Sequence, residues 1–299
     1  MIGGQALIEG VMMRSPRYVG VAVRNSKGNI VTKANKLPTP HPFWKLSFFR
    51  GIYVLVSMLV VGIRELNWSA SQATEEEETI SDWLLYLTLF ISLVFGIGLF
   101  VFVPYALTTL IGVHEEYSPF LFNFIDGSIK VLILLAYVYG ISFWDDVKRL
   151  YQYHGAEHMT VFCYEHEQEL TVKNVKKFST LHPRCGTSFL FVVILMSVLI
   201  FSFTPLLAQL IFPSFSTFSF LLRRVFLFAL RLGFLPLVAG LSYEFLKWSS
   251  RFAHHNALRI FVVPGLLLQR ITTRKPDDKQ IEIAISSLKE VLKAEGQKL

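Results

Sequence analysis

The sequence predicts a mainly α membrane protein with about four transmembrane helices and one interfacial or half-inserted helix. A small cytoplasmic α+β domain with an N-terminal β-hairpin completes the predicted fold. The chain is 53% hydrophobic and only 17% charged, whereas soluble domains carry about 25% charged residues. Four apolar stretches are long enough to cross a bilayer, and the basic residues gather in the segments around them. These two observations, with the turn chemistry described next, predict the fold class.

The first segment, residues 1–47, is polar and basic and contains the predicted hairpin. Val19, Val21 and Val23 alternate with other residues, which is typical of a strand with one buried face. The run from Asn25 to Gly28 supplies turn residues, and residues 29–33 are the predicted return strand. We therefore expect this segment to fold on the cytoplasmic side.

Residues 48–82 predict an interfacial helix followed by an acidic linker. The apolar run 52–63 is flanked by charged residues and is shorter than the roughly 20 residues that a transmembrane helix needs. It is therefore predicted to lie at the interface or to be half inserted. The acidic run 75–78 is interpreted as a solvated linker or the start of a helix.

The remaining sequence divides into two predicted helix pairs separated by a cytoplasmic loop. Residues 83–144 hold two transmembrane helices, the loop is 145–186, and residues 187–248 hold the second pair. The cytoplasmic tail, 249–299, ends in an amphipathic helix that begins near Asp277.

Basic residues predict the orientation of the chain. Lys and Arg concentrate before the first predicted span, in the 145–186 loop and in the tail, and are missing from loops 112–119 and 213–217. With four spans, the positive-inside rule places both termini in the cytoplasm. The net charge of +7 is explained in this way. No specific nucleic acid is expected as a partner, because no basic-aromatic motif accompanies the charge.

One motif in the 145–186 loop predicts chemistry. His154 and His158 are separated by one helical turn, so both imidazoles can reach one metal ion, and zinc is the expected metal. Glu157 lies beside them and is the candidate general base. The alternative is a surface helix with two exposed histidines, which Gly155 would weaken by about 1 kcal/mol relative to alanine.

A zinc site needs a third protein ligand, and several residues are candidates. His182 and Cys185 precede the third predicted span, and Glu244 lies near the cytoplasmic end of the fourth. The preferred order is His182, then Glu244, then Cys185. Glu165 is a further candidate, because it lies two helical turns after His158 and therefore on the same helix face.

Four separated motifs resemble the YqhQ-like family of bacterial membrane proteins. This family has no assigned function and is described as predicted metal-dependent enzymes. The resemblance implies a bacterial inner-membrane location and adds weight to a metal at His154 and His158, but it implies no substrate. The motifs that carry it are residues 3–14, residues 153–158, residues 182–188, and residues 264–269 with Thr272 and Thr273.

Two functions from different classes remain open. The first is a metal-dependent hydrolase at the cytoplasmic membrane face, acting on a membrane peptide or lipid. The second is a non-catalytic scaffold or biogenesis factor that binds the ribosome, a translocon or lipid headgroups, with a structural metal or none. A transporter is the weakest alternative, because the sequence has no inverted repeat. The oligomeric state is left open.

Overall fold

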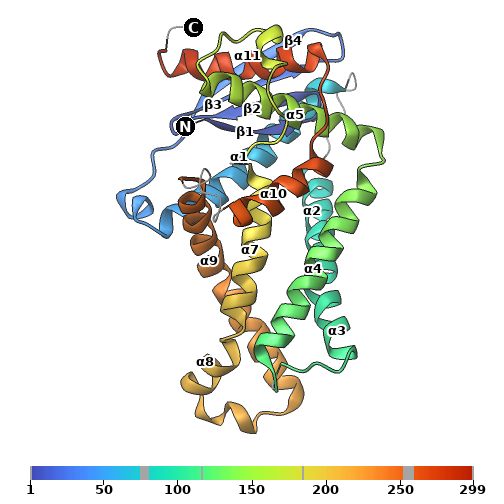
Figure 1. Ribbon diagram of the computed structural model, residues 1–299, viewed down its shortest axis with the longest axis vertical. Helices are drawn as coiled ribbons and strands as arrows, with labels where there is room; N and C mark the ends of the chain where they lie inside the picture. The colour runs from blue at the N-terminus through green and yellow to red at the C-terminus, as the bar shows by residue number, and fades with distance from the viewer. Residues whose placement is uncertain (1, 75–80, 116, 184, 252–258, 298–299) are drawn as a thin grey trace.

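The computed structural model describes residues 2–74, 81–115, 117–183, 185–251 and 259–297. Two regions follow each other along the longest axis (Figure 1). The sheet domain consists of strands β1–β4 with helices α1, α5, α6 and α11. The helical bundle consists of α2–α4 and α7–α9, and α10 lies where the two regions meet.

The N-terminal segment forms a four-stranded antiparallel sheet in the order β1-β2-β3-β4. The predicted hairpin is its second half, with Gly28 at a φ of 82° in the turn. The first half is a second hairpin that the sequence did not predict, with Leu7 opposite Gly10 across a turn of two residues. Glu9 in this turn has a φ of 51°. The strands are β1 (Gly3–Leu7), β2 (Gly10–Arg14), β3 (Tyr18–Arg24) and β4 (Ile30–Lys36).

The alternation along β3 divides the core of the sheet domain in two. Val19, Val21 and Val23 form a cluster with Leu7 and Met12 against one helix, α1, so the prediction that the three valines share one face is confirmed. On the opposite face, Ala22 belongs to a larger cluster with side chains of α5 and α11. The helices are α1 (Phe49–Ala73), α5 (Asp145–Glu165), α6 (Val172–Val175) and α11 (Asp278–Ala294).

Helix α1 is longer than the predicted interfacial run and has two different faces. Met58, Val61 and Trp68 pack against the sheet, whereas Val56, Leu59 and Val60 are exposed. The helix continues beyond the apolar run, where Glu65 is buried in an ion pair with Lys33, at 2.7 Å. A short 3-10 helix, η1 (Pro42–Lys45), precedes α1. The predicted acidic linker lies outside the described residues.

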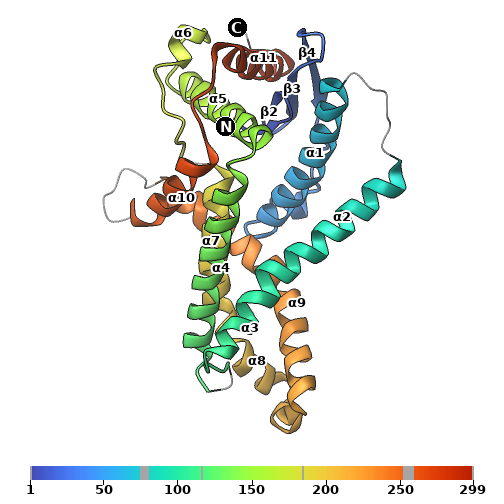
Figure 2. The ribbon, with the colours of Figure 1, turned by 90° about the vertical axis from the view of Figure 1, so that its right-hand side faces the viewer.

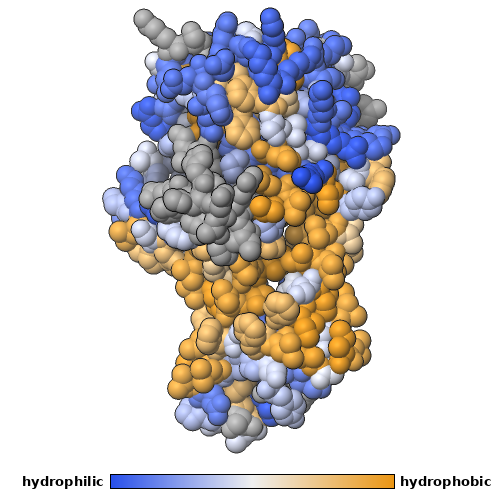
Figure 3. Space-filling model, in the orientation of Figure 1, coloured by the Kyte–Doolittle hydropathy of each residue, from blue (hydrophilic) through white to orange (hydrophobic). Residues whose placement is uncertain are grey.

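Within the described residues, three helices of the bundle are long and apolar enough to cross a membrane. A fourth span results if the pair α7–α8, bent by 43°, is counted as one. Their surfaces form the apolar band in the lower part of Figure 3. The elements are α2 (Asp82–Ile97), η2 (Gly98–Phe102), α3 (Val103–Leu110), α4 (Pro119–Ile141), α7 (Gly186–Phe201), α8 (Thr204–Ile211), η3 (Pro213–Thr217) and α9 (Phe220–Arg251).

Two features of the structure go beyond the sequence prediction. The first span continues past Pro104 to Leu110, because a π-helical turn, η2, precedes the proline and the chain stays helical. The tail also contains an additional helix, α10 (Arg259–Thr272), which packs against α7 at the junction of the two regions (Figure 2).

Candidate functional site

Helix α5 carries the His-x-x-Glu-His motif in its middle. Asp145 and Asp146 occupy its first turn, where their negative charges interact favourably with the positive end of the helix dipole. His154 and His158 lie on one face as predicted, with ring centroids 4.3 Å apart. Tyr153, Ala156 and Met159 point instead into the core of the sheet domain, so the helix has a buried structural face and a separate face for the two imidazoles.

Gly155 allows a second segment to pack tightly against this helix. A Cβ atom at this position would lie 2.1 Å from the carbonyl oxygen of Arg274. The amide of Arg274 donates a hydrogen bond to the carbonyl of Tyr151, at 2.9 Å. The glycine is therefore a packing requirement of the site, which corrects the interpretation that it only weakens the helix.

Both histidines are oriented by backbone carbonyl groups. Nδ1 of His154 lies 2.9 Å from the carbonyl oxygen of Thr272, and Nδ1 of His158 lies 2.5 Å from that of Thr180. A carbonyl can only accept, so each Nδ1 carries the proton and each Nε2 presents a lone pair. This arrangement is the one that metal-binding histidines show in proteins.

Cys185 completes a group of three potential ligands. Its Sγ lies 3.2 Å from Nε2 of His154. Each of the three residues offers one ligand atom, and these atoms lie within 4.8 Å of one another in the group His154, His158 and Cys185. Nε2 of His158 is buried and has no hydrogen-bond partner among the described residues. In the part of the chain that the structure describes, this is the one such group of three.

His182, the first-ranked third ligand, lies next to this group but outside it. Its ring centroid is 5.7 Å from that of His158 and 4.3 Å from that of Phe162. Its Nε2 lies 3.4 Å from a carboxylate oxygen of Glu165. Gln269 fixes its backbone by accepting from the amide of His182 and donating to its carbonyl, at 2.7 and 2.8 Å. Burial lowers the pKa of the His182 imidazole.

Glu244 has a different set of partners. Its two oxygens accept from the guanidinium of Arg50, and one also accepts from the amide of Phe48, at 3.2 Å. The carboxylate therefore joins α9 to the start of α1. The structure does not bring it into the group formed by His154, His158 and Cys185.

Glu157 is buried between α5 and the first strand. The backbone of Gly4 lies beside its carboxylate and favours the charged form, which acts to lower its pKa. A Cβ atom on Gly4 would lie 3.0 Å from Cγ of Glu157, so the strand approaches the carboxylate closely. Burial raises the pKa of Glu157, and the neighbouring His154 and His182 oppose this rise. The carboxyl group is thus close enough to the imidazoles to interact with them electrostatically.

Sequence reasoning missed the groups that orient the site. The carbonyls of Thr180 and Thr272 and the side chain of Gln269 come from segments far from α5 along the chain. Backbone carbonyls have no residue-specific signal. Gln269 and Thr272 do belong to one of the four motifs that carry the family resemblance, and that was the available signal.

Comparison with known proteins agrees with the resemblance read from the motifs. The model of a family described as "Protein of unknown function (DUF1385)" matches residues 46–294. The chain is 32% identical over 315 residues to "Uncharacterized protein YqhQ" of Bacillus subtilis (strain 168), covering 98% of this chain and 93% of that protein. No solved structure matches. The chain therefore belongs to the YqhQ-like DUF1385 family, whose function is unknown.

Proposed function

We propose that this chain is a metal-dependent hydrolase of the bacterial cytoplasmic membrane, with its site at the cytoplasmic face. The observation that carries the proposal is the convergence of His154, His158 and Cys185. The burial of His158 and Cys185, and the two carbonyl groups behind the imidazoles, distinguish this group from a chance cluster on a surface helix.

The donor set suits zinc. Two imidazole nitrogens and one sulfur are typical zinc ligands, and three protein ligands leave a fourth position for water or substrate. Zn–N distances of about 2.0 Å and Zn–S distances of about 2.3 Å place a nitrogen about 3.5 Å from a sulfur in a tetrahedral site. The observed 3.2 Å between Nε2 of His154 and Sγ of Cys185 needs only a small adjustment.

Three further residues have proposed roles at the metal centre. Thr272 and Thr180 accept from the two imidazoles and keep each Nε2 directed at the shared centre. Glu157 is the proposed base. Burial raises its pKa, so the protonated form is favoured after the carboxylate has accepted a proton. When bound, zinc would lower the pKa of a water molecule, so that this water could act as nucleophile near neutral pH.

The location of the site supports a substrate from the membrane. Cys185 directly precedes α7, part of a candidate span, so the proposed centre lies at the end of an apolar helix. The sheet domain and the segments around it carry most of the Lys and Arg, whereas loops at the far end of the bundle carry none. The positive-inside rule then favours a cytoplasmic sheet domain with both termini inside. A membrane peptide or a lipid is the proposed substrate class.

The second candidate is a scaffold or biogenesis factor with a structural metal. Glu157, His158 and Cys185 are all buried, and structural zinc sites are closed to solvent. The basic sheet domain would then bind the ribosome, a translocon or anionic headgroups.

Metal analysis of the purified full-length chain tests the site. We expect about one zinc per chain and its loss in His154→Ala, His158→Ala and Cys185→Ser. His166→Ala is the matched control, because His166 ends the same helix, is exposed and bonds only locally to the carbonyl of Phe162. Equal metal content in all five proteins would refute the site.

Glu157→Gln separates the two candidate functions. A hydrolase keeps its zinc and loses turnover of peptide or ester probes supplied in proteoliposomes. A scaffold keeps its zinc and its partners. Enrichment of ribosomal or translocon proteins with the variant and wild type alike would favour the scaffold.

A further inference from the structure

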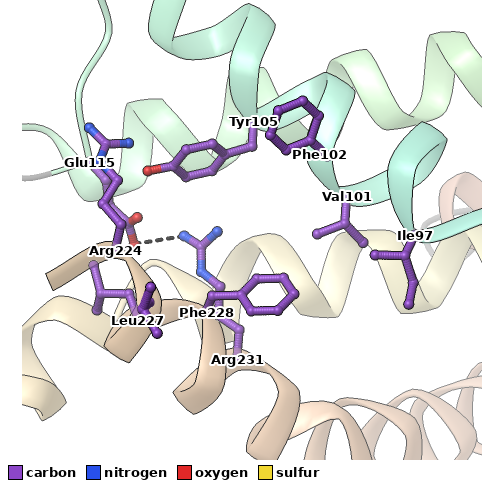
Figure 4. Close-up of a pocket in the computed structure, with 10 residues that line it drawn as sticks. Ile97, Val101, Phe102, Tyr105, Glu115, Arg224, Leu227, Phe228 and Arg231 are labelled. Carbon is purple, nitrogen blue, oxygen red and sulfur yellow. Dashed lines mark hydrogen bonds and ion pairs between the residues drawn. The ribbon is translucent and has the colours of Figure 1, made fainter. Parts of the chain in front are cut away.

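Two cavities of the molecule differ in how their charged side chains are partnered. One, of about 400 Å³, lies within the bundle, where the carboxylate of Glu115 accepts from the guanidinium of Arg231 at 2.6 Å (Figure 4). Arg231 also donates to Asn123 at 3.0 Å, which corrects the expectation that Asp126 would be its partner. Asp126 instead pairs with Lys130 on the same helix. The bundle thus supplies the ionic partner of this arginine itself.

The second cavity, of about 500 Å³, lies where the sheet domain meets the bundle. Strand β2, the chain after β4, η1, the first half of α1 and the C-terminal part of α9 contribute to its lining. The start of α1 lies beside the end of α9 that is nearest the sheet domain (Figure 1). A Cβ atom on Gly51 would lie 2.7 Å from Cβ of Tyr243, so the two helices touch here. The cavity has the volume of a small-molecule site, about 300–1,000 Å³.

Arg14 lines this second cavity and has no acidic partner among the described residues. Its Nη2 donates to Oγ of Ser57, at 2.9 Å. Its Nη1 is buried and has no hydrogen-bond partner within the described part of the chain. Burial lowers the pKa of this guanidinium, and a buried charged donor without an acceptor is costly. Arg14 therefore calls for an anion that reaches it from the cavity.

The charge of the lining as a whole is positive. Among the described residues that line the cavity, three are basic and none is acidic. One of the three, Arg50, is balanced by Glu244, which binds it through both carboxylate oxygens. The other two are Arg14 and Lys45, and the Lys45 side chain is exposed at the end of η1. Two cations of the cavity are thus available to an anionic ligand.

The aromatic walls and the position of the cavity indicate which anion fits it. Trp44 and Tyr53 line it with ring centroids 6.2 Å apart, and Tyr243 comes from the end of the candidate span Leu221–Trp248. Trp and Tyr are enriched where a membrane meets water. Trp44 and Leu46 are 36% and 55% exposed. A phosphate with attached acyl chains uses both the cations and this apolar rim, whereas a free anion uses only the cations.

We propose that this cavity binds one anionic phospholipid of the membrane leaflet that faces the sheet domain. Its phosphate accepts from Arg14 and lies near Lys45, and its apolar part packs against Trp44. The site shares no residue with the proposed metal centre and does not rest on the proposed hydrolase.

Native mass spectrometry of the full-length chain in detergent tests this site. The probes are dioleoyl phosphatidylglycerol and dioleoyl phosphatidylcholine. Charge-assisted contacts imply that wild type retains phosphatidylglycerol about tenfold more strongly than phosphatidylcholine. Arg14→Gln should abolish this preference. His154→Ala should keep it even where zinc is lost, which separates this site from the proposed metal centre.

A second charge variant tests the site without disturbing a buried residue. Lys45 is exposed, so Lys45→Gln should leave the fold intact and reduce the preference about two- to threefold. Lys27→Gln and Arg64→Gln are the matched controls, because both side chains are exposed and neither lines the cavity. Both controls should retain phosphatidylglycerol as wild type does.

Trp44→Ala tests the apolar contact without changing charge. It should weaken the retention of both lipids and leave the preference between them unchanged. Gel filtration verifies that each variant is folded. An unchanged preference in folded Arg14→Gln or in Lys45→Gln, an equal loss in the two controls, full retention in Trp44→Ala, or displacement of the lipid by inorganic phosphate would each overturn the proposal.

Discussion

The sheet domain and the bundle bury their apolar residues in opposite ways. The sheet domain has a core on each face of its sheet, with Val11, Ile283 and Leu288 fully enclosed. In the bundle, the most apolar window of the span Tyr86–Leu110 has no buried residue, and that of Pro119–Ile141 is 22% buried. The sheet domain is thus stabilised by its own interior, whereas the bundle leaves apolar surface exposed, as is typical of helices able to cross a membrane. Substitutions of the same kind should therefore have different effects in the two regions.

The largest expected effect is in the bundle, where polar contacts are few. Arg231→Met removes the partner of Glu115, a carboxylate that is only 3% exposed and whose pKa burial raises. Breaking a buried pair costs about 3–5 kcal/mol. Thermal unfolding in detergent should show a large loss of stability of the bundle. Glu115→Gln with Arg231→Met should recover part of it; no recovery would contradict the role assigned to the pair.

Truncation of one leucine in each region tests the difference between the sheet domain and the bundle directly. Leu288 in α11 is fully buried, whereas Leu132 in α4 is 65% exposed. Leu288→Ala leaves a cavity and should lower the free energy of unfolding by about 2–5 kcal/mol. Leu132→Ala should change it by less than about 0.5 kcal/mol. Thermal melts followed by circular dichroism measure both, and equal effects would break the distinction between the regions.

Glycine substitutions should differ in sign. Gly155→Ala places Cβ against the carbonyl of Arg274 and should destabilise the sheet domain by about 1–3 kcal/mol. Gly140→Ala in α4 meets nothing within 4 Å, so it should stabilise its helix by up to about 1 kcal/mol. Gly155→Ala should also reduce zinc content. A stable Gly155→Ala protein with full metal would show that the close approach is dispensable.

The smallest expected effect concerns an ion pair on the surface of the sheet domain. Arg149 binds both oxygens of Glu9 but is about half exposed. Arg149→Ala should therefore lower the unfolding free energy by no more than about 1 kcal/mol. The difference from wild type should shrink further at high salt. A loss comparable with that of Arg231→Met would show that exposure does not determine the strength of these pairs.

The sequence identified features that depend on neighbours along the chain. The valines of β3 and the turn before Gly28 predicted one hairpin, and long apolar runs predicted helices able to cross a membrane. The first hairpin was missed, because residues 3–14 contain three glycines and lack a clear alternation. The bend between α7 and α8 depends on a local break near Ser202 that composition does not reveal.

Only the part of the candidate site that lies on a single helix could be predicted from the sequence. His154 and His158 were found because residues four apart share a helix face. Cys185 was ranked last among three candidates, although the structure brings it to the two imidazoles. Its position depends on how the segment that precedes α7 approaches α5, which is a tertiary arrangement. Metal occupancy and the hydrolase activity remain predictions.

The contact between α11 and the sheet has a consequence for biosynthesis. Ser287 donates to the carbonyl of Gly20 at 3.0 Å, and α11 packs over β2 and β3. The strands leave the ribosome before any candidate span, whereas the helix that covers them is translated after every candidate span. The surface of the sheet that α11 covers therefore stays without this helix until all candidate spans and α11 have been translated.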